Sequence, residues 1–259
     1  MSSGKQFDEL VSIVKQLRGD NGCPWDRKQT HGSLLPYFLE EAYEVMETVD
    51  QQDWNTLEEE LGDILLHVVF QTRIAEENGE FGLESVLETV NRKLVQRHPH
   101  VFGEASASGP FHAKVNWEAA KQQEKGRSSR LEGVPKTLPA LVRALRLQQK
   151  ASYAGFDWER IDQVWEKVQE ELEELKDAHA RGTREDIEEE VGDLLFALVN
   201  VCRFLDISPE DALRKSNEKF TRRFQEMEKE LKKQGRSLEQ AELETMDRIW
   251  NRIKGADKQ

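Results

Sequence analysis

The sequence has few prolines and few cysteines, and it has no stretch in which apolar and polar residues alternate as they do in a β-strand. Its 259 residues include seven prolines and two cysteines. So little proline leaves long helices uninterrupted, and abundant Glu, Leu, Lys, Gln and Ala favour them. Cys23 and Cys202 lie far apart and form neither a CxxC pair nor a zinc-type Cys/His spacing. We therefore expect an all-α, cytoplasmic protein with reduced thiols.

The sequence also has no net positive charge and no long apolar run. The formal net charge of −13 at pH 7 disfavours binding to a nucleic-acid polymer or an anionic membrane, because both attract clustered Lys and Arg. No apolar run reaches the ~18 residues of a membrane span, and the first residues lack the apolar core of a signal peptide. The glycine motifs GxxxxGK[ST] and GxGxxG are missing too. The sequence thus predicts no nucleic-acid polymer, no membrane partner, and no P-loop or Rossmann site.

A pattern of carboxylates occurs twice, with the second copy displaced by 130 residues. In each copy a Glu-x-x-Glu pair precedes an acidic pair of the same spacing, and the residues are Glu41, Glu44, Glu60, Asp63 and then Glu171, Glu174, Glu190, Asp193. Residues three apart lie on one face of a helix about one turn apart, so each pair can converge on one point. Two such helices packed together would bring four carboxylates to the same spot.

Each second acidic pair leads directly into an apolar segment, Ile64 to Phe70 in one copy and Leu194 to Val199 in the other. Carboxylates held beside a core cost several kcal/mol per ion unless a cation compensates them. Mg²⁺ prefers such hard oxygen ligands. The repeat therefore predicts a magnesium site in each half. The alternative is that these acids are ordinary solvated residues on helix surfaces, which are common in a chain with 34% charged residues.

Basic and aromatic residues recur in the same order after each acidic pattern. Lys219 with Arg223 and later Trp250 in the second half correspond to Lys93 with Arg97 and Trp117 in the first. Arg and Lys bind phosphate oxygens, and Trp stacks on nucleobases. Together with a metal, these groups describe a site for a nucleoside triphosphate. Each group could instead have a structural role. The basic pairs could be ordinary exposed helix residues, and the tryptophans could be core residues.

The repeat predicts two helical halves of similar build. We expect helices near 5–18, 34–50, 54–78, 83–98 and 115–124 in the first half, and near 138–151, 159–180, 184–205, 209–234 and 240–254 in the second. Segments 103–110 and 126–139 are rich in Gly, Ser and Pro and should be loops. The resulting domains are 1–125 and 140–259, joined by a linker at 126–139.

These motifs resemble the EExxE and ExxD signature of MazG-type nucleoside triphosphate pyrophosphohydrolases, over essentially the whole chain. Gly22 to Asp26, Arg97 to Phe102 and Asn217 to Phe220 also resemble that family. The resemblance implies two tandem helical-bundle domains, a homodimer, and Mg²⁺-dependent cleavage of an NTP between the α and β phosphates. It implies metal ligands at Glu171, Glu174, Glu190 and Asp193, phosphate contacts at Lys219 and Arg223, a base contact at Trp250, and a nucleotide lining that includes Lys167, Glu170, Asp186 and Glu189.

Some alternatives stay open at this point. A ferritin-like di-metal bundle would need Glu-x-x-His motifs, and no histidine here has Glu three positions before it. A non-enzymatic acidic adaptor would need no metal. The proton acceptor could be Glu170 or Glu189, and the preferred base is undetermined. Since the second half matches the family throughout, while Pro99 interrupts the corresponding helix of the first, we expect the second half to carry most of the catalysis.

Overall fold

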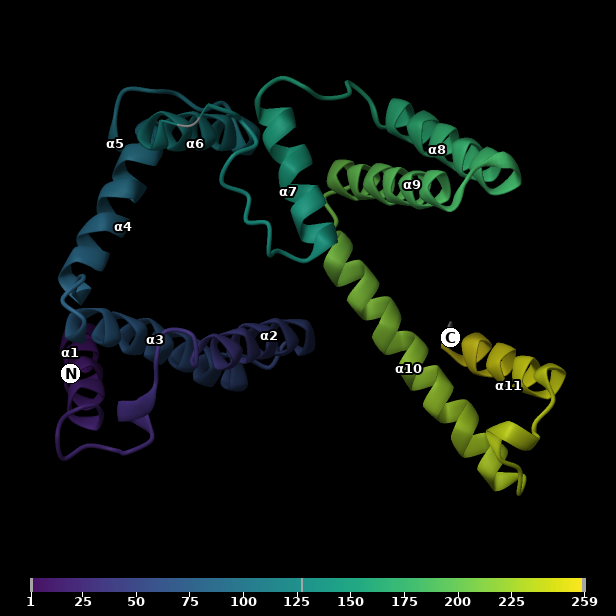
Figure 1. Ribbon diagram of the computed structural model, residues 1–259, viewed down its shortest axis with the longest axis horizontal. Helices are drawn as coiled ribbons and strands as arrows, with labels where there is room; N and C mark the ends of the chain where they lie inside the picture. Colours follow the sequence, from purple (N-terminus) through teal and green to yellow (C-terminus); the bar gives the residue numbers. More distant parts are fainter. Residues whose placement is uncertain (1, 127, 258–259) are drawn as a thin grey trace. The chain divides into compact units, whose positions relative to one another are not determined.

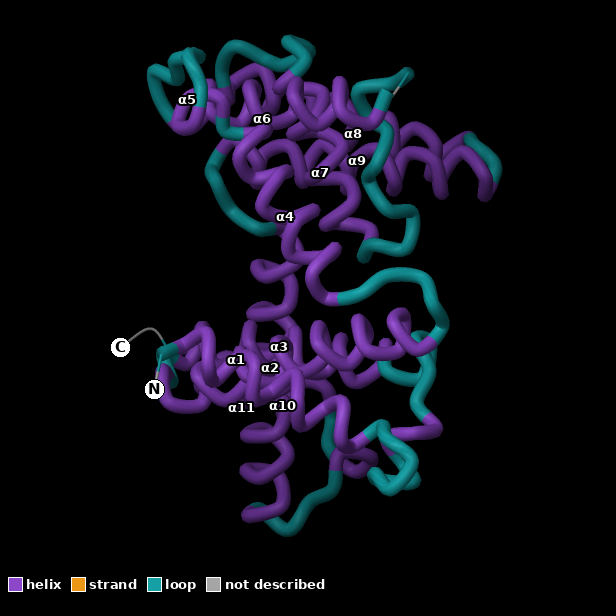
Figure 2. The backbone as a smooth tube through the Cα atoms, turned by 90° about the vertical axis from the view of Figure 1, so that its left-hand side faces the viewer, coloured by secondary structure: helices purple, strands orange, loops and turns teal. Residues whose placement is uncertain are grey.

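The computed structural model describes residues 2–126 and 128–257. Figure 1 shows the helices in chain order, and Figure 2 shows only helices and loops among the described residues, as predicted. The chain forms two compact units, Met1–Ser106 and Ala107–Gln259, and each is described here by itself. Within the described residues, no helix is long and apolar enough to cross a membrane.

The first unit is organised around its longest helix, α3. Its elements are α1 (Ser3–Leu17), a 3₁₀ turn at Asp26–Lys28, α2 (Leu35–Gln51), α3 (Trp54–Glu77), α4 (Leu83–Arg97) and the single turn α5 (Pro99–Phe102). Helices α1, α2 and α4 all pack on α3, and Figure 1 shows α2 lying along it. Val14, Leu34, Val69, Phe70 and Ile74 form the buried core. This core fixes the α2–α3 pair that carries the first acidic pattern.

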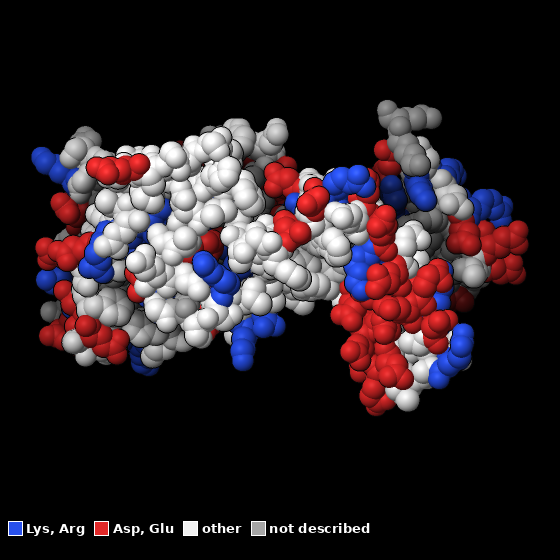
Figure 3. All heavy atoms as spheres, turned by 90° about the horizontal axis from the view of Figure 1, so that it is seen from above, with Lys and Arg blue, Asp and Glu red and all other residues white. Residues whose placement is uncertain are grey.

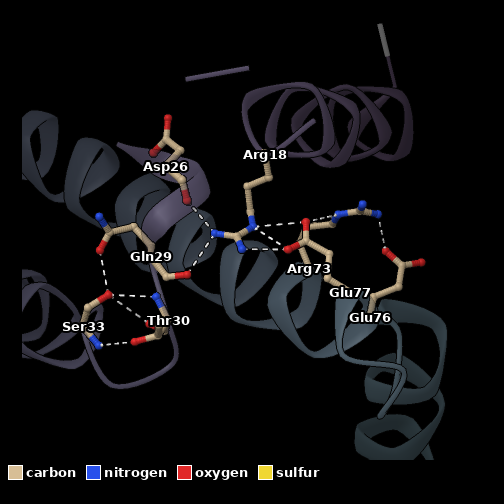
Figure 4. Close-up of polar contacts among 8 residues, drawn as sticks. All are labelled: Arg18, Asp26, Gln29, Thr30, Ser33, Arg73, Glu76 and Glu77. Atoms are coloured by element: carbon tan, nitrogen blue, oxygen red, sulfur yellow. Dashed lines mark hydrogen bonds and ion pairs between the residues drawn. The ribbon is translucent and has the colours of Figure 1, made fainter. Parts of the chain in front are cut away.

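The loop between α1 and α2 is held by Arg18, whose side chain is almost fully buried and whose polar contacts are drawn in Figure 4. Arg18 donates hydrogen bonds to the main-chain oxygens of Asp26 and Gln29 and to the carboxylate of Glu77 at the end of α3. The guanidinium also lies over the Phe70 ring. Since a buried charge needs such partners, Arg18 ties the loop to the core and sets where α2 begins.

The second unit contains an antiparallel pair of helices, α8 and α9. Its elements are α6 (Pro110–Lys125), α7 (Ala140–Tyr153), α8 (Ile161–Arg181), α9 (Arg184–Phe204), α10 (Pro209–Lys233), a 3₁₀ turn at Leu238–Gln240, and α11 (Leu243–Ala256). Helix α7 packs on α9, and α11 packs on α10. One core cluster lies between α8 and α9, with Val164, Val168, Ala197 and Val201, and another between α10 and α11, with Met227, Leu231 and Ile249.

Local capping explains where the helices that carry acidic residues begin. The Asp53 side chain accepts a hydrogen bond from the Thr56 N–H at the start of α3. At the start of α9, Thr183 and Asp186 cap each other's main-chain N–H groups. These caps satisfy N–H groups that lack partners within the helix. They therefore fix the register of α3 and α9, and with it the position of the second acidic pair in each unit.

Most predicted helices agree with the structure to within a few residues, and the exception is α6. It begins at Pro110 rather than near 115, and it packs on α7 through an ion-paired Glu118. By its contacts α6 therefore belongs to the second compact unit, although the sequence placed residues up to 125 in the first half. A further short turn, α5, follows α4 because Pro99 can occupy the first turn of a new helix but cannot continue an old one.

Candidate metal centre

Three carboxylates of the second unit meet between α8 and α9. Glu171 and Glu174 come from α8 and Glu190 from α9, and each offers an oxygen within 4.8 Å of the others. Glu171 is buried, with 6% of its surface exposed, whereas Glu174 is exposed and Glu190 half-buried. The i, i+3 spacing on α8 and the close packing of the two helices produce this convergence of three carboxylates, where the repeat predicted four. Figure 3 shows Asp and Glu side chains gathered over the right-hand part of one face, where α8 and α9 lie.

Two carboxylates of this cluster, Glu174 and Glu190, have raised pKa values. The pKa of Glu174 is raised by partial desolvation and then by the neighbouring charge of Glu171, and the pKa of Glu190 is raised by partial desolvation and then by Glu174 and Glu171. Like charges brought together disfavour ionisation in this way. A divalent cation between the carboxylates would remove the repulsion. The cluster therefore has the donor set and the electrostatic need of a Mg²⁺ or similar hard-cation site.

One protein cation already lies at the edge of the cluster. The Lys167 ammonium is 2.7 Å from a carboxylate oxygen of Glu170 and 2.7 Å from one of Glu171. Its hydrogen bonds to these two carboxylates raise the pKa of Lys167, so it stays charged. Lys167 thus compensates the buried Glu171 and leaves Glu174 and Glu190 as the groups that face solvent.

The first unit repeats the arrangement on α2 and α3. Oxygens of Glu41, Glu60 and Asp63 lie within 4.8 Å of one another. The pKa of Glu41 is raised to about 7, first by burial and then by Asp63, Glu44 and Glu60. The pKa of Glu60 is raised by burial and then by Glu44. The first half therefore also has a carboxylate cluster that fits a hard cation.

The remaining residue of each predicted set of four lies next to its cluster rather than inside it. Asp193 is not among the carboxylates that lie within 4.8 Å in the second unit, and Glu44 is not among those in the first. Both still act on their neighbours, because Asp193 contributes to the raised pKa of Glu190 and Glu44 to that of Glu60, in each case after burial. The described side chains thus bring three carboxylates together in each unit, with the fourth nearby.

An open hollow lies beside the second cluster. Its volume is about 400 Å³, and its lining includes Glu174, Glu190 and Asp186. The Asp186 side chain is bound to the Thr183 N–H at 2.7 Å, so it shapes the start of α9 as well as the hollow. Glu189, the other residue expected near the nucleotide on α9, is exposed. The hollow gives a polyphosphate room to approach the carboxylates.

The predicted basic and aromatic residues lie on α10 and α11, away from the carboxylates. Figure 1 shows α11 along the part of α10 that is remote from α7 and α9. Lys219 is exposed, and the Trp250 ring packs against Phe220 at 5.3 Å between centroids. Among the described residues, Lys219, Arg223 and Trp250 make no ion pair or hydrogen bond with Glu171, Glu174 or Glu190. Within a single chain, the carboxylates of α8 and α9 therefore lie close together, but the predicted residues of α10 and α11 do not contact them.

Sequence reasoning missed one residue of this basic region, Asp257. Its carboxylate accepts a hydrogen bond from Arg223 Nε at 2.7 Å and two from Arg222. Asp257 stands 34 residues after Arg223, and no local spacing rule links positions so far apart. Only the packing of α11 on α10 places this carboxylate beside the arginines.

Comparison with known proteins identifies the family. Residues 29–102 and 160–227 each match the MazG nucleotide pyrophosphohydrolase domain. The nucleoside triphosphate pyrophosphohydrolase/pyrophosphatase MazG of Thermotoga maritima is 49% identical over 99% of this chain and 98% of its own length. This chain is a member of the MazG family. The domain is matched twice, as expected for two tandem helical domains, and each matched stretch contains one carboxylate cluster.

Two further proteins are similar to this chain over nearly its whole length. The nucleoside triphosphate pyrophosphohydrolase of Escherichia coli K12 is 41% identical over 96% of this chain and 97% of its own length. The Bacillus subtilis protein YabN is 45% identical over 98% of this chain, which spans 52% of that longer protein. The second matched stretch includes Lys219 and Arg223, whereas Trp250 lies after it. The family resemblance stated from the motifs is thereby confirmed.

Proposed function

We propose that this protein is a Mg²⁺-dependent pyrophosphohydrolase. It cleaves nucleoside triphosphates, and deoxynucleoside triphosphates, between the α and β phosphates to give a nucleoside monophosphate and pyrophosphate, and so clears unwanted nucleotides from the pool. The observation that carries the proposal is the convergence of Glu171, Glu174 and Glu190 beside an open hollow. The pyrophosphohydrolase names of the relatives from T. maritima and E. coli support it.

We assign each site residue a role from the chemistry of its side chain. Glu171, Glu174 and Glu190 hold the cation, with Asp193 beside them. Bound Mg²⁺ supplies charge neutralisation on the phosphates and lowers the pKa of a coordinated water. Lys219 and Arg223 bind phosphate oxygens, and Trp250 stacks on the base. Such contacts tolerate different bases, which fits a broad range of triphosphates.

Of the two carboxylates considered as proton acceptor, we favour Glu189. Glu170 is bound to Lys167 at 2.7 Å, so its carboxylate is already engaged by a cation. Glu189 is exposed and forms no ion pair with any residue that the structure describes. Its neighbour Glu190 places it next to the cluster, where it can receive a proton from an attacking water.

We also propose that two copies form a homodimer through the faces of the paired helices. Helix α9 leaves several large apolar side chains exposed beside the cluster: Val191, Leu195, Phe196 and Leu198. Helices α2 and α3 do the same with Leu39, Tyr43, Leu61 and Leu65. Exposed large apolar side chains suit an interface, and a second copy offers the same side chains in a self-complementary pair. A sedimentation or light-scattering mass of one chain would contradict the dimer.

Lys219→Ala tests the proposed phosphate contact. We expect kcat/KM for pyrophosphate release to fall about tenfold or more, because a charge-assisted contact contributes about 1.5–3 kcal/mol. The melting temperature should change little, since Lys219 is exposed. Lys229→Ala is a matched control on the same helix, where the lysine is also exposed, and it should keep wild-type kinetics. Equal kinetics in all three proteins would show that Lys219 is only a surface residue.

Mg²⁺ should stabilise the fold, because it relieves the repulsion within both carboxylate clusters. In thermal melts we expect the midpoint to rise by several degrees when excess Mg²⁺ replaces EDTA. The rise should be larger at pH 8 than at pH 5.5, since the pKa of Glu41 is about 7 and its carboxylate must be ionised to bind a cation. An unchanged midpoint at both pH values would contradict a metal site and favour a non-enzymatic acidic adaptor.

A further inference from the structure

A network of hydrogen bonds outside the carboxylate cluster joins the end of α11 to the middle of α10. Asp257 accepts hydrogen bonds from Arg222 Nη1 and Nη2 at 2.8 and 2.9 Å and from Arg223 Nε at 2.7 Å. The Arg223 side chain is 12% exposed and that of Asp257 19%, whereas Arg222 is half exposed. Two arginines therefore share one carboxylate, and the less exposed arginine is the predicted phosphate ligand.

The contact leaves one edge of Arg223 available. A guanidinium has donors on the Nε side and on the Nη1–Nη2 side, and phosphates are bound well by two parallel N–H groups. Among the residues that the structure describes, Asp257 accepts from Arg223 only at Nε, so the Nη1 and Nη2 groups can donate to phosphate oxygens. The pKa of Asp257 is lowered to about 2 by Arg222 and Arg223, so this carboxylate stays ionised at neutral pH. Two arginines and one carboxylate leave the group with a net positive charge, which suits a polyphosphate.

We infer that Asp257 is a positioning residue for triphosphate binding: it orients Arg223 for the phosphates and couples that arginine to Trp250. Trp250 lies on the same helix, α11, and packs against Phe220 of α10 at 5.3 Å. The Asp257 contact and the Trp250 contact thus clamp α11 onto α10 at two places. The arginine that binds phosphate and the ring that stacks on the base are held at a fixed separation. Preorganisation of this kind lowers the entropy lost on binding.

The inference rests on the proposed function, in which Arg223 binds phosphate. Its test must therefore distinguish a failure of the inferred role of Asp257 from a failure of the proposed function. The variants are Asp257→Asn, which removes the charge, Asp257→Glu, which keeps it, and Asp247→Asn, an exposed aspartate on the same helix. We would measure KM and kcat for pyrophosphate release from an NTP, the Kd for inorganic tripolyphosphate with Mg²⁺, and the melting temperature of the full-length protein.

We expect Asp257→Asn to raise KM and the tripolyphosphate Kd about tenfold, the loss expected when a charged hydrogen-bond partner is removed, with kcat nearly unchanged. Asp257→Glu should have KM and Kd values closer to those of the wild type, and Asp247→Asn should have the same values as the wild type. Unchanged KM and Kd in Asp257→Asn would overturn the inference, as would tighter binding, because tighter binding means that the carboxylate competes with phosphate. If the wild type releases no pyrophosphate, the proposed function fails, and the tripolyphosphate Kd still decides the inference.

Discussion

Replacing Glu174 with Ala is expected to lower the rate of pyrophosphate release on the order of a hundredfold, the scale seen when a group that stabilises transition-state charge is lost. Glu174 has a carboxylate oxygen within 4.8 Å of those of Glu171 and Glu190 and also lines the adjacent hollow. Its removal breaks the cluster without disturbing the core, since Glu174 is exposed. The rate of pyrophosphate release at saturating Mg²⁺ and NTP measures this loss.

The matched variant in the first half, Glu44→Ala, should cost a smaller share of turnover or alter the choice of substrate. The first unit has a carboxylate cluster, but its α4 ends at Arg97, and Trp117 lies on α6, which belongs to the other compact unit. Trp117, the predicted counterpart of Trp250, therefore lies outside the first unit. Asp193→Ala and Asp63→Ala make a second matched pair. A nearly active Asp193→Ala protein with an inactive Asp63→Ala protein would reverse the assignment.

Replacing Glu118 with Ala is expected to destabilise the second unit by about 3 kcal/mol, the usual cost of leaving a buried charge without its partner. Glu118 is 2.9 Å from the Lys150 ammonium and 3.3 Å from Arg146 Nη2, and the side chains of Glu118 and Lys150 are 11% and 6% exposed. Urea unfolding would give the free energy of unfolding. The double variant Glu118→Leu with Lys150→Met should recover most of the loss, because it leaves no buried charge. A single variant as stable as wild type would contradict a structural role for this pair in docking α6.

The same pair predicts how stability depends on pH. Burial alone would raise the pKa of Glu118, but the hydrogen bond and charge of Lys150, with Lys121 and Arg146, lower it. A carboxylate with a lowered pKa contributes stability above its unfolded value of about 4.3 and loses that contribution as the pH falls. The stability difference between wild type and Glu118→Ala should therefore be constant near neutral pH and shrink below about pH 4.

The helices and the acidic clusters could be predicted because both follow from local spacing. Caps such as Thr183 with Asp186 mark a helix start in the sequence itself, and the repeated i, i+3 carboxylates indicate one face of a helix. Contacts between distant residues leave no such pattern. Glu118 and Lys150, whose ion pair joins α6 to the second unit, are 32 residues apart in the sequence. Arg223 and Asp257 are 34 residues apart. The pairing of Lys167 with Glu171 is local, at i, i+4, and that spacing signals an ion pair.

The central claim is that the carboxylate cluster of α8 and α9 supports cleavage between the α and β phosphates. Phosphorus NMR of ATP incubated with the protein and Mg²⁺ tests it most directly, with Glu174→Ala as the matched control. We predict that AMP and pyrophosphate appear in equal amounts with the wild-type protein, and that both almost disappear with the variant or with EDTA. ADP and inorganic phosphate as the products, or equal turnover by wild type and variant, would contradict the claim.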